Sequence, residues 1–244
     1  MILQFLGECS DEIFGGYPWF FRQDCLSSNT FPWSLAIEER QNLLHPEISR
    51  KINLKEYVDY KYSKSLSELE ILDEDSAQTA EKRKISYLTL NWFMQTLIER
   101  SSKMADATGL EIRIPFCDYR LVQYLWNVPW EMKSKNDREK GLLRHVVEGI
   151  LPQEIIERKK SPYPKTHNPS YLLKVKQMLQ DIIKNKNSPI NALLNKEYIL
   201  DILASDGSSF TRPWFGQLMT GPQLMAYLIQ VNMWLETYNP KIEI

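Results

Sequence analysis

The chain has 244 residues, enough to bury a large core as one large domain or two small ones. Its formal net charge of -1 gives no electrostatic basis for binding nucleic acid or an anionic membrane. The three cysteines lie far apart without metal-ligand spacing, and no apolar run approaches the roughly 20 residues of a membrane span, so we expect a cytoplasmic chain with reduced thiols.

The first predicted element is a short strand over residues 2–6, followed by an acidic turn. The turn contains three carboxylates between glycines: Gly7, Glu8, Asp11, Glu12, Gly15 and Gly16. A strand that ends in a loop opening a helix is where open α/β sheets place ligands. The alternative is an acidic helix start, in which Ser10 or Asp11 is the N-cap and Glu12 interacts favourably with the helix dipole. Spacing alone favours neither interpretation.

Two helices are predicted in the next part of the chain. Ser34 is the expected N-cap of a helix that stops at Pro46, and Asn53 begins a second, polar helix. The acidic run over residues 68–75 is expected to be a solvated connection.

The longest helical pattern covers residues 77–107. Its middle is apolar nearly all round, so we expect a buried central helix that ends before Gly109 in the left-handed conformation. Apolar and charged residues then alternate from Leu110 to Ile114, which predicts a short strand. Asp118 is the expected N-cap of the helix that follows.

A further helix is predicted to begin at Lys140. A cation gains nothing from the dipole at a helix N-terminus, so an anionic ligand would explain this lysine better. The alternative, an exposed lysine, is favoured by the local sequence alone. Residues 158–165 carry four cations and indicate a phosphate-facing or solvated loop more than a nucleic-acid patch. Residues 169–244 alternate polar helices with turns and contain no internal repeat.

Three stretches resemble signatures of one family. Residues 7–17, Gly-Glu-Cys-Ser-Asp-Glu-Ile-Phe-Gly-Gly-Tyr, resemble Ser-Gly-Glu-Gly-(Ala/Ser)-Asp-Glu-(Leu/Ile)-Phe-Gly-Gly-Tyr, the signature of the synthetase domain in glutamine-hydrolysing asparagine synthetases. Residues 100–105, Arg-Ser-Ser-Lys-Met-Ala, followed by residues 109–118, Gly-Leu-Glu-Ile-Arg-Ile-Pro-Phe-Cys-Asp, resemble a second signature, which usually ends Gly-(Leu/Val)-Glu-(Val/Ala)-Arg-Val-Pro-Phe-Leu-Asp. Residues 140–144 match a third, a lysine followed three residues later by Leu-Arg. The chain departs from the pattern at Leu6, where serine is common, and at Cys9, where many members have glycine.

The resemblance implies that residues 1–244 are the C-terminal portion of the synthetase domain. That domain is an ATP-pyrophosphatase-like fold of the adenine-nucleotide α-hydrolase type, and we expect a mainly α remnant of it with one or two short strands. The sequence contains no Ser-Gly-Gly-x-Asp-Ser pyrophosphate loop and no N-terminal cysteine nucleophile with a glutaminase domain. A truncated, incomplete synthetase that is inactive alone is therefore expected.

The resemblance also implies the chemistry of an amide-forming ligase. Such a synthetase adenylates the side-chain carboxylate of aspartate, and ammonia released from glutamine displaces AMP. We therefore expect asparagine synthesis through a β-aspartyl-AMP intermediate, with ATP and Mg²⁺ as cofactors. Aspartate and ammonia or glutamine are the implied substrates. A missing N-terminal half or glutaminase domain is the implied partner, and a homodimer is left open.

The family's functional residues map onto the matching positions of this sequence. Asp11 is the implied metal ligand, as a hard oxygen donor. Lys140 is implied to neutralise the leaving pyrophosphate, and Glu8 to act as the catalytic base for incoming ammonia. The implied nucleotide-binding residues are Gly7, Glu8 and Lys140. Arg100 and Lys103 are candidates for holding the substrate carboxylates.

Three alternatives accompany this interpretation. Glu111 and Arg113 are either substrate contacts or a structural ion pair, and we favour the ion pair. The chain is either an asparagine synthetase or a relative that adenylates a different carboxylate; Glu8 argues against the lactam-forming relatives, which commonly have tyrosine there. In a different class, the chain would be a non-catalytic helical interaction fragment with exposed apolar surface.

Overall fold

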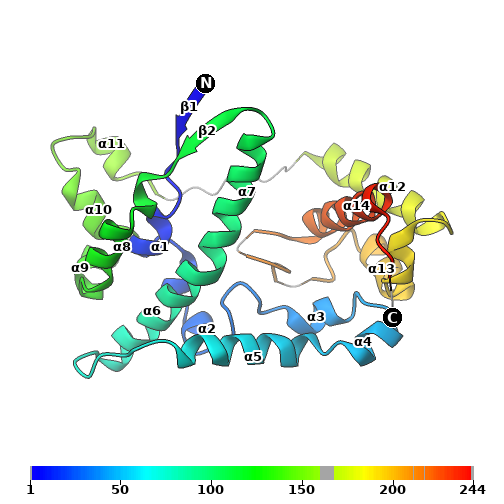
Figure 1. Cartoon of the computed structure of the whole chain (residues 1–244), viewed down its shortest axis with the longest axis horizontal. Coiled ribbons are helices and arrows are strands. Elements are labelled where there is room, and N and C mark those ends of the chain that lie inside the picture. Colours follow the sequence, from blue (N-terminus) through cyan, green and yellow to red (C-terminus); the bar gives the residue numbers. More distant parts are fainter. Residues whose placement is uncertain (1, 160–167, 211, 217, 243–244) are drawn as a thin grey trace. The chain divides into compact units, whose positions relative to one another are not determined.

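The computed structural model describes residues 2–159, 168–210, 212–216 and 218–242. This part of the chain is mainly α-helical and contains two short parallel strands, which confirms the expected fold class (Figure 1). The chain divides into two compact units, one formed by Met1–Ser28 and Ser63–Ser161 and the other by Asn29–Tyr62 and Pro162–Ile244. No helix among the described residues has the length and hydropathy needed to cross a membrane.

The first unit contains both strands and the three signatures. Its helices and strands are β1 (Ile2–Phe5), α1 (Ser10–Phe14), α2 (Gln23–Leu26), α6 (Ala77–Leu88), α7 (Gln95–Asp106), β2 (Leu110–Arg113), α8 (Tyr119–Trp126), α9 (Trp130–Lys133), α10 (Gly141–Val146) and α11 (Gln153–Ile156). Short 3₁₀ helices cover Pro18–Phe20, Pro115–Cys117 and Lys135–Asp137. Helix α5 (Leu54–Ser67) continues through the boundary between the two units.

The regular elements in the described part of the second unit are helices, and two isolated antiparallel bridges join Leu44 to Leu194 and Phe215 to Met219. The unit contains α3 (Ile37–Gln41), α4 (Pro46–Lys51), α12 (Pro169–Lys184), the 3₁₀ helix Pro189–Ala192, α13 (Lys196–Ala204) and α14 (Gly221–Tyr238). The core lies between α12, α13 and α14, where Leu179, Ile199 and Leu224 are fully buried. Gly221 begins α14 directly against Gly207, and a Cβ on either glycine would come within 2.4 Å of the other's Cα.

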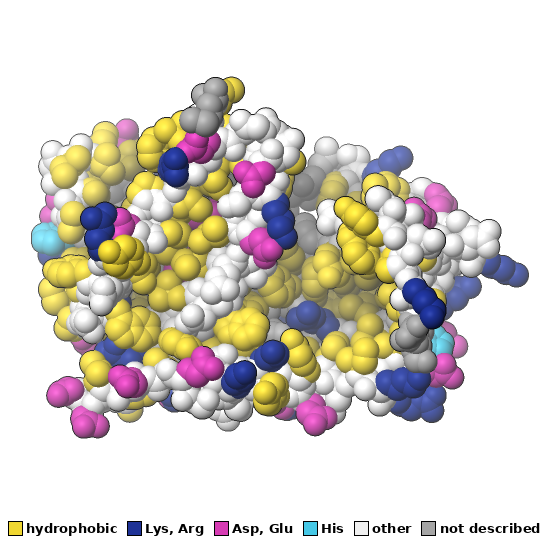
Figure 2. Space-filling model, viewed as in Figure 1, with side chains coloured by type: hydrophobic (Ala, Val, Ile, Leu, Met, Phe, Trp, Pro, Cys, Tyr) yellow, Lys and Arg dark blue, Asp and Glu magenta, His cyan; other side chains and the backbone are white. Residues whose placement is uncertain are grey.

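The two strands pair in parallel, with Ile2 opposite Leu110 and Phe5 opposite Arg113. The predicted strands are therefore confirmed, and the backbone N–H of Leu6 extends the pairing by donating to the Arg113 carbonyl at 2.9 Å. The apolar side chains of β1 are at the surface, because Ile2 is 73% and Phe5 68% exposed. Figure 2 shows hydrophobic side chains exposed in this region.

Two predicted helix caps are wrong. Neither Ser10 nor Asp11 caps α1: Cys9 is the N-cap residue and no side chain bonds the first helical amides. The Ser10 hydroxyl instead donates to the Gly7 carbonyl at 2.8 Å. Likewise α3 begins after Ala36, and the hydroxyl of Ser34 accepts a hydrogen bond from Arg40 at 3.1 Å. In both cases another hydrogen bond engages the hydroxyl.

The predicted helix over residues 77–107 is confirmed as α6 and α7, which are joined by a π-helical turn, Thr89–Met94. The extra residue in a π turn shifts the faces of the helix relative to a regular α-helix. Burial in the middle is less complete than expected: Phe93 is buried, but Trp92 is 38% exposed and donates from Nε1 to Ser65 Oγ at 2.9 Å.

The predicted solvated connection over residues 68–75 ends in a buried ion pair. Asp75 accepts two hydrogen bonds from Arg83, from Nε at 2.6 Å and from Nη2 at 2.9 Å. Its side chain is only 7% exposed, so this residue is an exception to the solvated character of the segment. Because the pair joins the connection to α6, it fixes the N-terminal end of the long helix.

Asp75→Asn tests the contribution of this pair. The hydrogen bond from Arg83 lowers the pKa of Asp75, so the unfolded chain takes up a proton there more readily than the folded chain. The stabilisation is present at neutral pH and disappears as pH falls through the depressed pKa, below the unfolded value of about 3.9. We expect Asp75→Asn to lower the free energy of unfolding by about 1–2 kcal/mol at neutral pH in urea titrations.

At pH 3 and below, the difference should shrink, because a protonated aspartic acid resembles asparagine in shape and charge. The same loss at both pH values would contradict this account of the pair.

Candidate functional site

The site is built where the two parallel strands end. The carboxyl ends of β1 and β2 lie at one edge of the sheet, so the loops after residues 5 and 113 start side by side. Helix α1, which follows the first loop, packs against α8 and α10. An edge-to-face contact between Phe14 and Phe116, with ring centroids 6.1 Å apart, joins the first two signatures. Parallel sheets commonly bind ligands at this edge.

A tightly folded turn brings Lys140 to this edge. Lys140 has φ 55°, in the left-handed region, and is the N-cap residue of α10, which confirms the predicted helix start. Asn136, earlier in the same turn, has φ 64°. Gly141 leaves no room for a side chain, since a Cβ there would lie 2.5 Å from the backbone N and O of Lys135. Such backbone conformations are costly for residues with a Cβ and are concentrated at functional sites.

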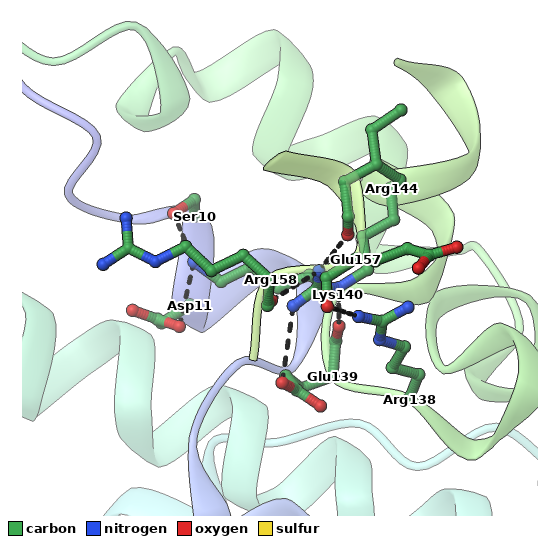
Figure 3. Close-up of polar contacts among 9 residues, drawn as sticks. Ser10, Asp11, Arg138, Glu139, Lys140, Arg144, Glu157 and Arg158 are labelled. Atoms are coloured by element: carbon green, nitrogen blue, oxygen red, sulfur yellow. Dashed lines mark hydrogen bonds and ion pairs between the residues drawn. The ribbon is translucent and has the colours of Figure 1, made fainter. Parts of the chain in front are cut away.

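Lys140 connects the third signature to the first. Its ammonium group lies 3.0 Å from Asp11 Oδ1 and donates a hydrogen bond to Ser10 Oγ at 2.9 Å (Figure 3). The side chains of Lys140 and Asp11 are 23% and 25% exposed, so both are open to a ligand. The structure therefore places two of the predicted functional residues in direct contact.

The Gly15-Gly16 pair makes this contact possible. A Cβ on Gly16 would lie 1.8 Å from Asp11 Oδ1 and 2.5 Å from Lys140 Cε. Gly15 has φ 69°, and a Cβ there would lie 2.4 Å from the ring of Trp130. Both positions therefore require glycine, one for the side chains of the site and the other for the aromatic core.

The third acidic residue of the turn has a structural role. Glu12 is buried, and its Oε1 accepts a hydrogen bond from the hydroxyl of Tyr17 at 2.8 Å. Burial raises the pKa of Glu12, and burial together with Glu12 raises the pKa of Tyr17. Tyr17 in turn stacks on Trp19, with ring centroids 4.3 Å apart. Glu12 thus anchors the aromatic core, and its carboxylate is not available at the surface of the site.

Glu8 is held by a serine that the sequence analysis did not identify. Its Oε1 accepts a hydrogen bond from Ser101 Oγ, on α7, at 2.7 Å. Its Oε2 is buried and has no hydrogen-bond partner among the described residues. An unpaired buried carboxylate oxygen is unusual and indicates a place where a ligand could donate a hydrogen bond. Ser101 lies within the second signature, directly after Arg100, but only the charged residues of that stretch were selected as functional candidates.

The predicted carboxylate-binding residues are not brought into this group. Lys103 pairs with Glu99 at 2.6 Å on the surface of α7, with 73% and 65% of the side chains exposed. Arg100 is exposed, and we find no partner for its side chain within the described part of the chain. Their role in substrate binding stays a prediction. Glu111 and Arg113 form an ion pair with each other, as the structural alternative predicted.

Arg144 holds the segment after α11 next to the Lys140 turn. Its guanidinium donates to the backbone carbonyls of Glu139, at 2.9 Å, of Ile156, and of Arg158, at 3.0 Å. It also pairs with Glu139 Oε1 at 3.4 Å. Burial lowers the pKa of Arg144. This partly buried guanidinium therefore holds two backbone segments together, which suits Arg144 to positioning other residues.

The beginning of the basic stretch follows this clamp. Arg138 donates to the Glu157 carbonyl, and Figure 3 shows the side chain of Arg158 directed to the same side as Ser10 and Asp11. Residues 160–165 of the predicted phosphate-facing loop lie outside the described residues. The part that is described adds positive charge beside Lys140.

A metal ion would find few protein ligands here. Within the described ranges, no group of three or more histidine, cysteine, aspartate or glutamate residues is arranged to hold a metal. Magnesium is often bound through one or two carboxylates, with the remaining oxygens supplied by water and substrate phosphates. Asp11 suits this way of binding magnesium: it would be the single carboxylate ligand, and a phosphorylated compound would supply further oxygens.

Comparison with known proteins agrees with the signatures. Residues 3–236 match the family described as asparagine synthase. The chain is 48% identical over 242 residues to asparagine synthetase [glutamine-hydrolyzing] 3 of Bacillus subtilis. The aligned region covers 99% of this chain and 39% of that protein. Asparagine synthetase [glutamine-hydrolyzing] 1 of Bacillus subtilis is 29% identical over 130 residues, 53% of this chain and 20% of its own length. The human asparagine synthetase [glutamine-hydrolyzing] is 40% identical over 67 residues, 26% of this chain and 12% of its own length.

This chain thus spans about two fifths of the length of the Bacillus subtilis synthetase that it matches almost from end to end. The resemblance inferred from the three signatures is confirmed, because the family match extends over nearly all of the sequence. The chain belongs to the asparagine synthase family.

Proposed function

We propose that this chain supplies part of an ATP-dependent synthetase site that converts aspartate to asparagine. The match to glutamine-hydrolysing asparagine synthetases over nearly the whole chain supports the reaction class. The observation that carries the proposal is the contact of Lys140 with Asp11 and Ser10, at 3.0 Å and 2.9 Å. This contact brings residues of the first and third signatures, which lie far apart in the sequence, into one partly exposed group of charged side chains.

Lys140 is suited to neutralising a phosphate anion. Adenylation of aspartate crowds a carboxylate against the nucleotide phosphates, so cations must offset negative charge as pyrophosphate leaves. Lys140 stands at the start of α10, where the helix dipole does not favour a cation, and a metal ion bound to Asp11 would free the lysine's single charge for a phosphate. The side chain of Arg158, directed to the same side in Figure 3, would add a second positive charge.

Asp11 is the proposed magnesium ligand. Its carboxylate is a hard oxygen donor that is partly exposed and already lies beside the ammonium group of Lys140. When bound, the metal would supply charge neutralisation at the phosphates. Asp11 would hold it from the protein side, while Gly16 leaves the space that the carboxylate needs.

Glu8 is the proposed base in the second half of the reaction. Ammonia that attacks the β-aspartyl-AMP carbonyl must lose a proton as it becomes an amide. Ser101 holds one oxygen of the Glu8 carboxylate at 2.7 Å, which leaves Oε2 to accept that proton. A fixed orientation and an unoccupied buried oxygen are the properties that a positioned base requires.

We further propose that residues 1–244 are the C-terminal portion of the synthetase domain. The sequence contains no pyrophosphate loop, and the chain spans 39% of a full-length relative. A pyrophosphate loop and a glutaminase domain encoded outside this sequence would complete the enzyme and provide ammonia. The apolar surface of β1, where Ile2 and Phe5 are exposed, is a suitable place for that complementary part to pack.

Lys140→Gln should weaken the binding of inorganic pyrophosphate, since it removes the ammonium group beside Ser10 and Asp11. We expect a loss of affinity of about tenfold or more, equivalent to ~1.4 kcal/mol, in calorimetric titrations with magnesium pyrophosphate. Lys55→Gln is the matched control, because Lys55 also pairs with an aspartate but lies exposed on α5. Equal affinity of Lys140→Gln and the unchanged chain would contradict the anion-binding role.

Glu8→Gln should not destabilise the fold, although Glu8 is partly buried. The substitution removes the negative charge of a carboxylate whose Oε2 is not hydrogen-bonded to any described residue, and it keeps an oxygen for the hydrogen bond from Ser101. We expect the free energy of unfolding to stay the same or rise by about 1 kcal/mol, whereas Ser101→Ala should lower it by about 1 kcal/mol. Urea unfolding measures both. A loss of stability in Glu8→Gln as large as that in Ser101→Ala would show that Glu8 is retained for structure.

A further inference from the structure

A small cavity in the first unit lies between α6 and the segment over residues 126–133. Its volume is about 20 Å³, whereas a single water molecule needs about 10–15 Å³. The polar side chains at the cavity and the two indole rings that border it belong to Thr79, Arg83, Ser86, Lys133, Trp126 and Trp130. Those from α6 are spaced to share one helix face, and Trp130 and Lys133 are three residues apart on α9. The cavity therefore gathers hydrogen-bond donors and positive charge from two helices.

Lys133 brings to this cavity a positive charge that no described residue balances. The residue is 6% exposed, and its ammonium group forms no hydrogen bond or ion pair within the described part of the chain. Burial, together with the positive charge of Arg83, lowers the pKa of Lys133 to about 8, so the amine is still mainly protonated at neutral pH. A buried charge is strongly unfavourable unless an opposite charge or a hydrogen-bond acceptor compensates it.

Trp130 brings a second donor without an acceptor. Its Nε1 is buried and has no hydrogen-bond partner among the described residues. The ring is held in place, because it stacks on Phe20 with centroids 4.9 Å apart and a Cβ on Gly15 would lie 2.4 Å from its Cη2 atom. Lys82 Nζ lies 4.6 Å from the ring centroid, which adds positive charge beside the same indole. A buried N–H without an acceptor is rare in a native structure and indicates a place where an acceptor binds.

The neighbouring cations on α6 are compensated, in contrast to Lys133. Arg83 donates to both carboxylate oxygens of Asp75, at 2.6 Å and 2.9 Å, so this carboxylate is already engaged. Nearby acidic residues partly offset the effect of burial on the pKa of Lys82. The uncompensated charge at the cavity is therefore that of Lys133.

We propose that this cavity binds one small monovalent anion, chloride, between α6 and α9. The anion would accept hydrogen bonds from the ammonium group of Lys133 and the indole N–H of Trp130, and the hydroxyl of Ser86 would be a third donor. Its charge follows from the unbalanced lysine. Its size follows from the volume, which admits a monatomic ion but not a carboxylate or phosphate group. A water molecule would accept hydrogen bonds from the two donors but would leave the charge unbalanced.

The bound anion would hold α9 against α6. Helix α9 leads into the turn that carries Lys140, and Trp130 packs against Gly15 of the first signature, so the anion would support the candidate site from behind. The inference does not depend on the proposed synthetase activity, because none of the residues that it uses takes part in that reaction.

Crystallography with bromide tests where the anion binds. Crystals of the unchanged chain soaked in sodium bromide should show an anomalous peak in the cavity, within hydrogen-bonding distance of Lys133 Nζ and Trp130 Nε1. A water molecule in the cavity, or a cavity without an anomalous peak, would overturn the proposal.

Thermal unfolding tests whether the anion binds in solution. We expect chloride to raise the melting temperature by about 2–4 °C relative to gluconate at equal ionic strength, the shift expected when the anion is at about five times its dissociation constant. Lys133→Met removes the charge and keeps an unbranched side chain, so its melting temperature should be the same in both salts. Lys174→Met is the matched control, since Lys174 is exposed on α12, and it should keep the full response to chloride.

A second variant makes the result independent of a single substitution. Trp130→Phe keeps a ring for stacking on Phe20 and removes the N–H donor, so it should reduce the response to chloride even if Lys133→Met does not fold. The proposal is overturned if chloride does not stabilise the unchanged chain, or if Lys133→Met and Trp130→Phe respond to chloride as strongly as Lys174→Met.

Discussion

The parallel pairing of β1 with β2 is the constraint on which the candidate site depends. It joins the first signature, near the start of the sequence, to the second, and the hydrogen bond from Leu6 to Arg113 continues it to the last residue before the acidic turn. Because both strands run in the same direction, the loops that carry Glu8 and Cys117 leave the sheet at the same edge. Helix α7 packs against β2, and its Ser101 donates a hydrogen bond to Glu8 in the loop that follows β1.

The three carboxylates near this edge of the sheet are compensated to different extents. Lys140 and Asp11 compensate each other and remain partly exposed, whereas Glu12 is withdrawn into the core under the hydroxyl of Tyr17. Glu8 keeps one buried oxygen for which the described residues offer no hydrogen-bond partner. An unsatisfied buried carboxylate oxygen costs free energy, and such costs are common at binding sites.

Sequence periodicity predicted the elements that depend on local patterns. The alternation over residues 110–114 gave a strand, the apolar pattern over 77–107 gave the long helix, and Asp118 caps α8 as expected, through a bond from the Arg120 amide at 2.9 Å. The caps at Ser10 and Ser34 failed for a shared reason. Each hydroxyl has a competing partner, Gly7 and Lys140 in one case and Arg40 in the other, and part of that competition arises only on folding.

The family signatures predicted part of the candidate site from the sequence. Glu8, Asp11 and Lys140 were identified by those signatures, and the contact between Asp11 and Lys140 is consistent with one shared pocket. Ser101 was missed although it lies within the second signature, because only the charged residues there were selected and its partner is distant in the sequence. Lys103 was selected for its charge, yet that charge is paired with Glu99 on the helix surface. Spacing along one helix could have suggested that pair, which is an i,i+4 interaction.

Transplantation into a complete relative tests the central claim most directly. This chain would replace the matching region of asparagine synthetase 3 of Bacillus subtilis, to which it is 48% identical over 242 residues. The measurement is asparagine formed from aspartate, ATP and ammonium or glutamine by the purified, folded chimera. We predict asparagine formation that requires both aspartate and ATP. A folded chimera that binds ATP and releases pyrophosphate only with a different carboxylate, or that forms no amide at all, would contradict the account.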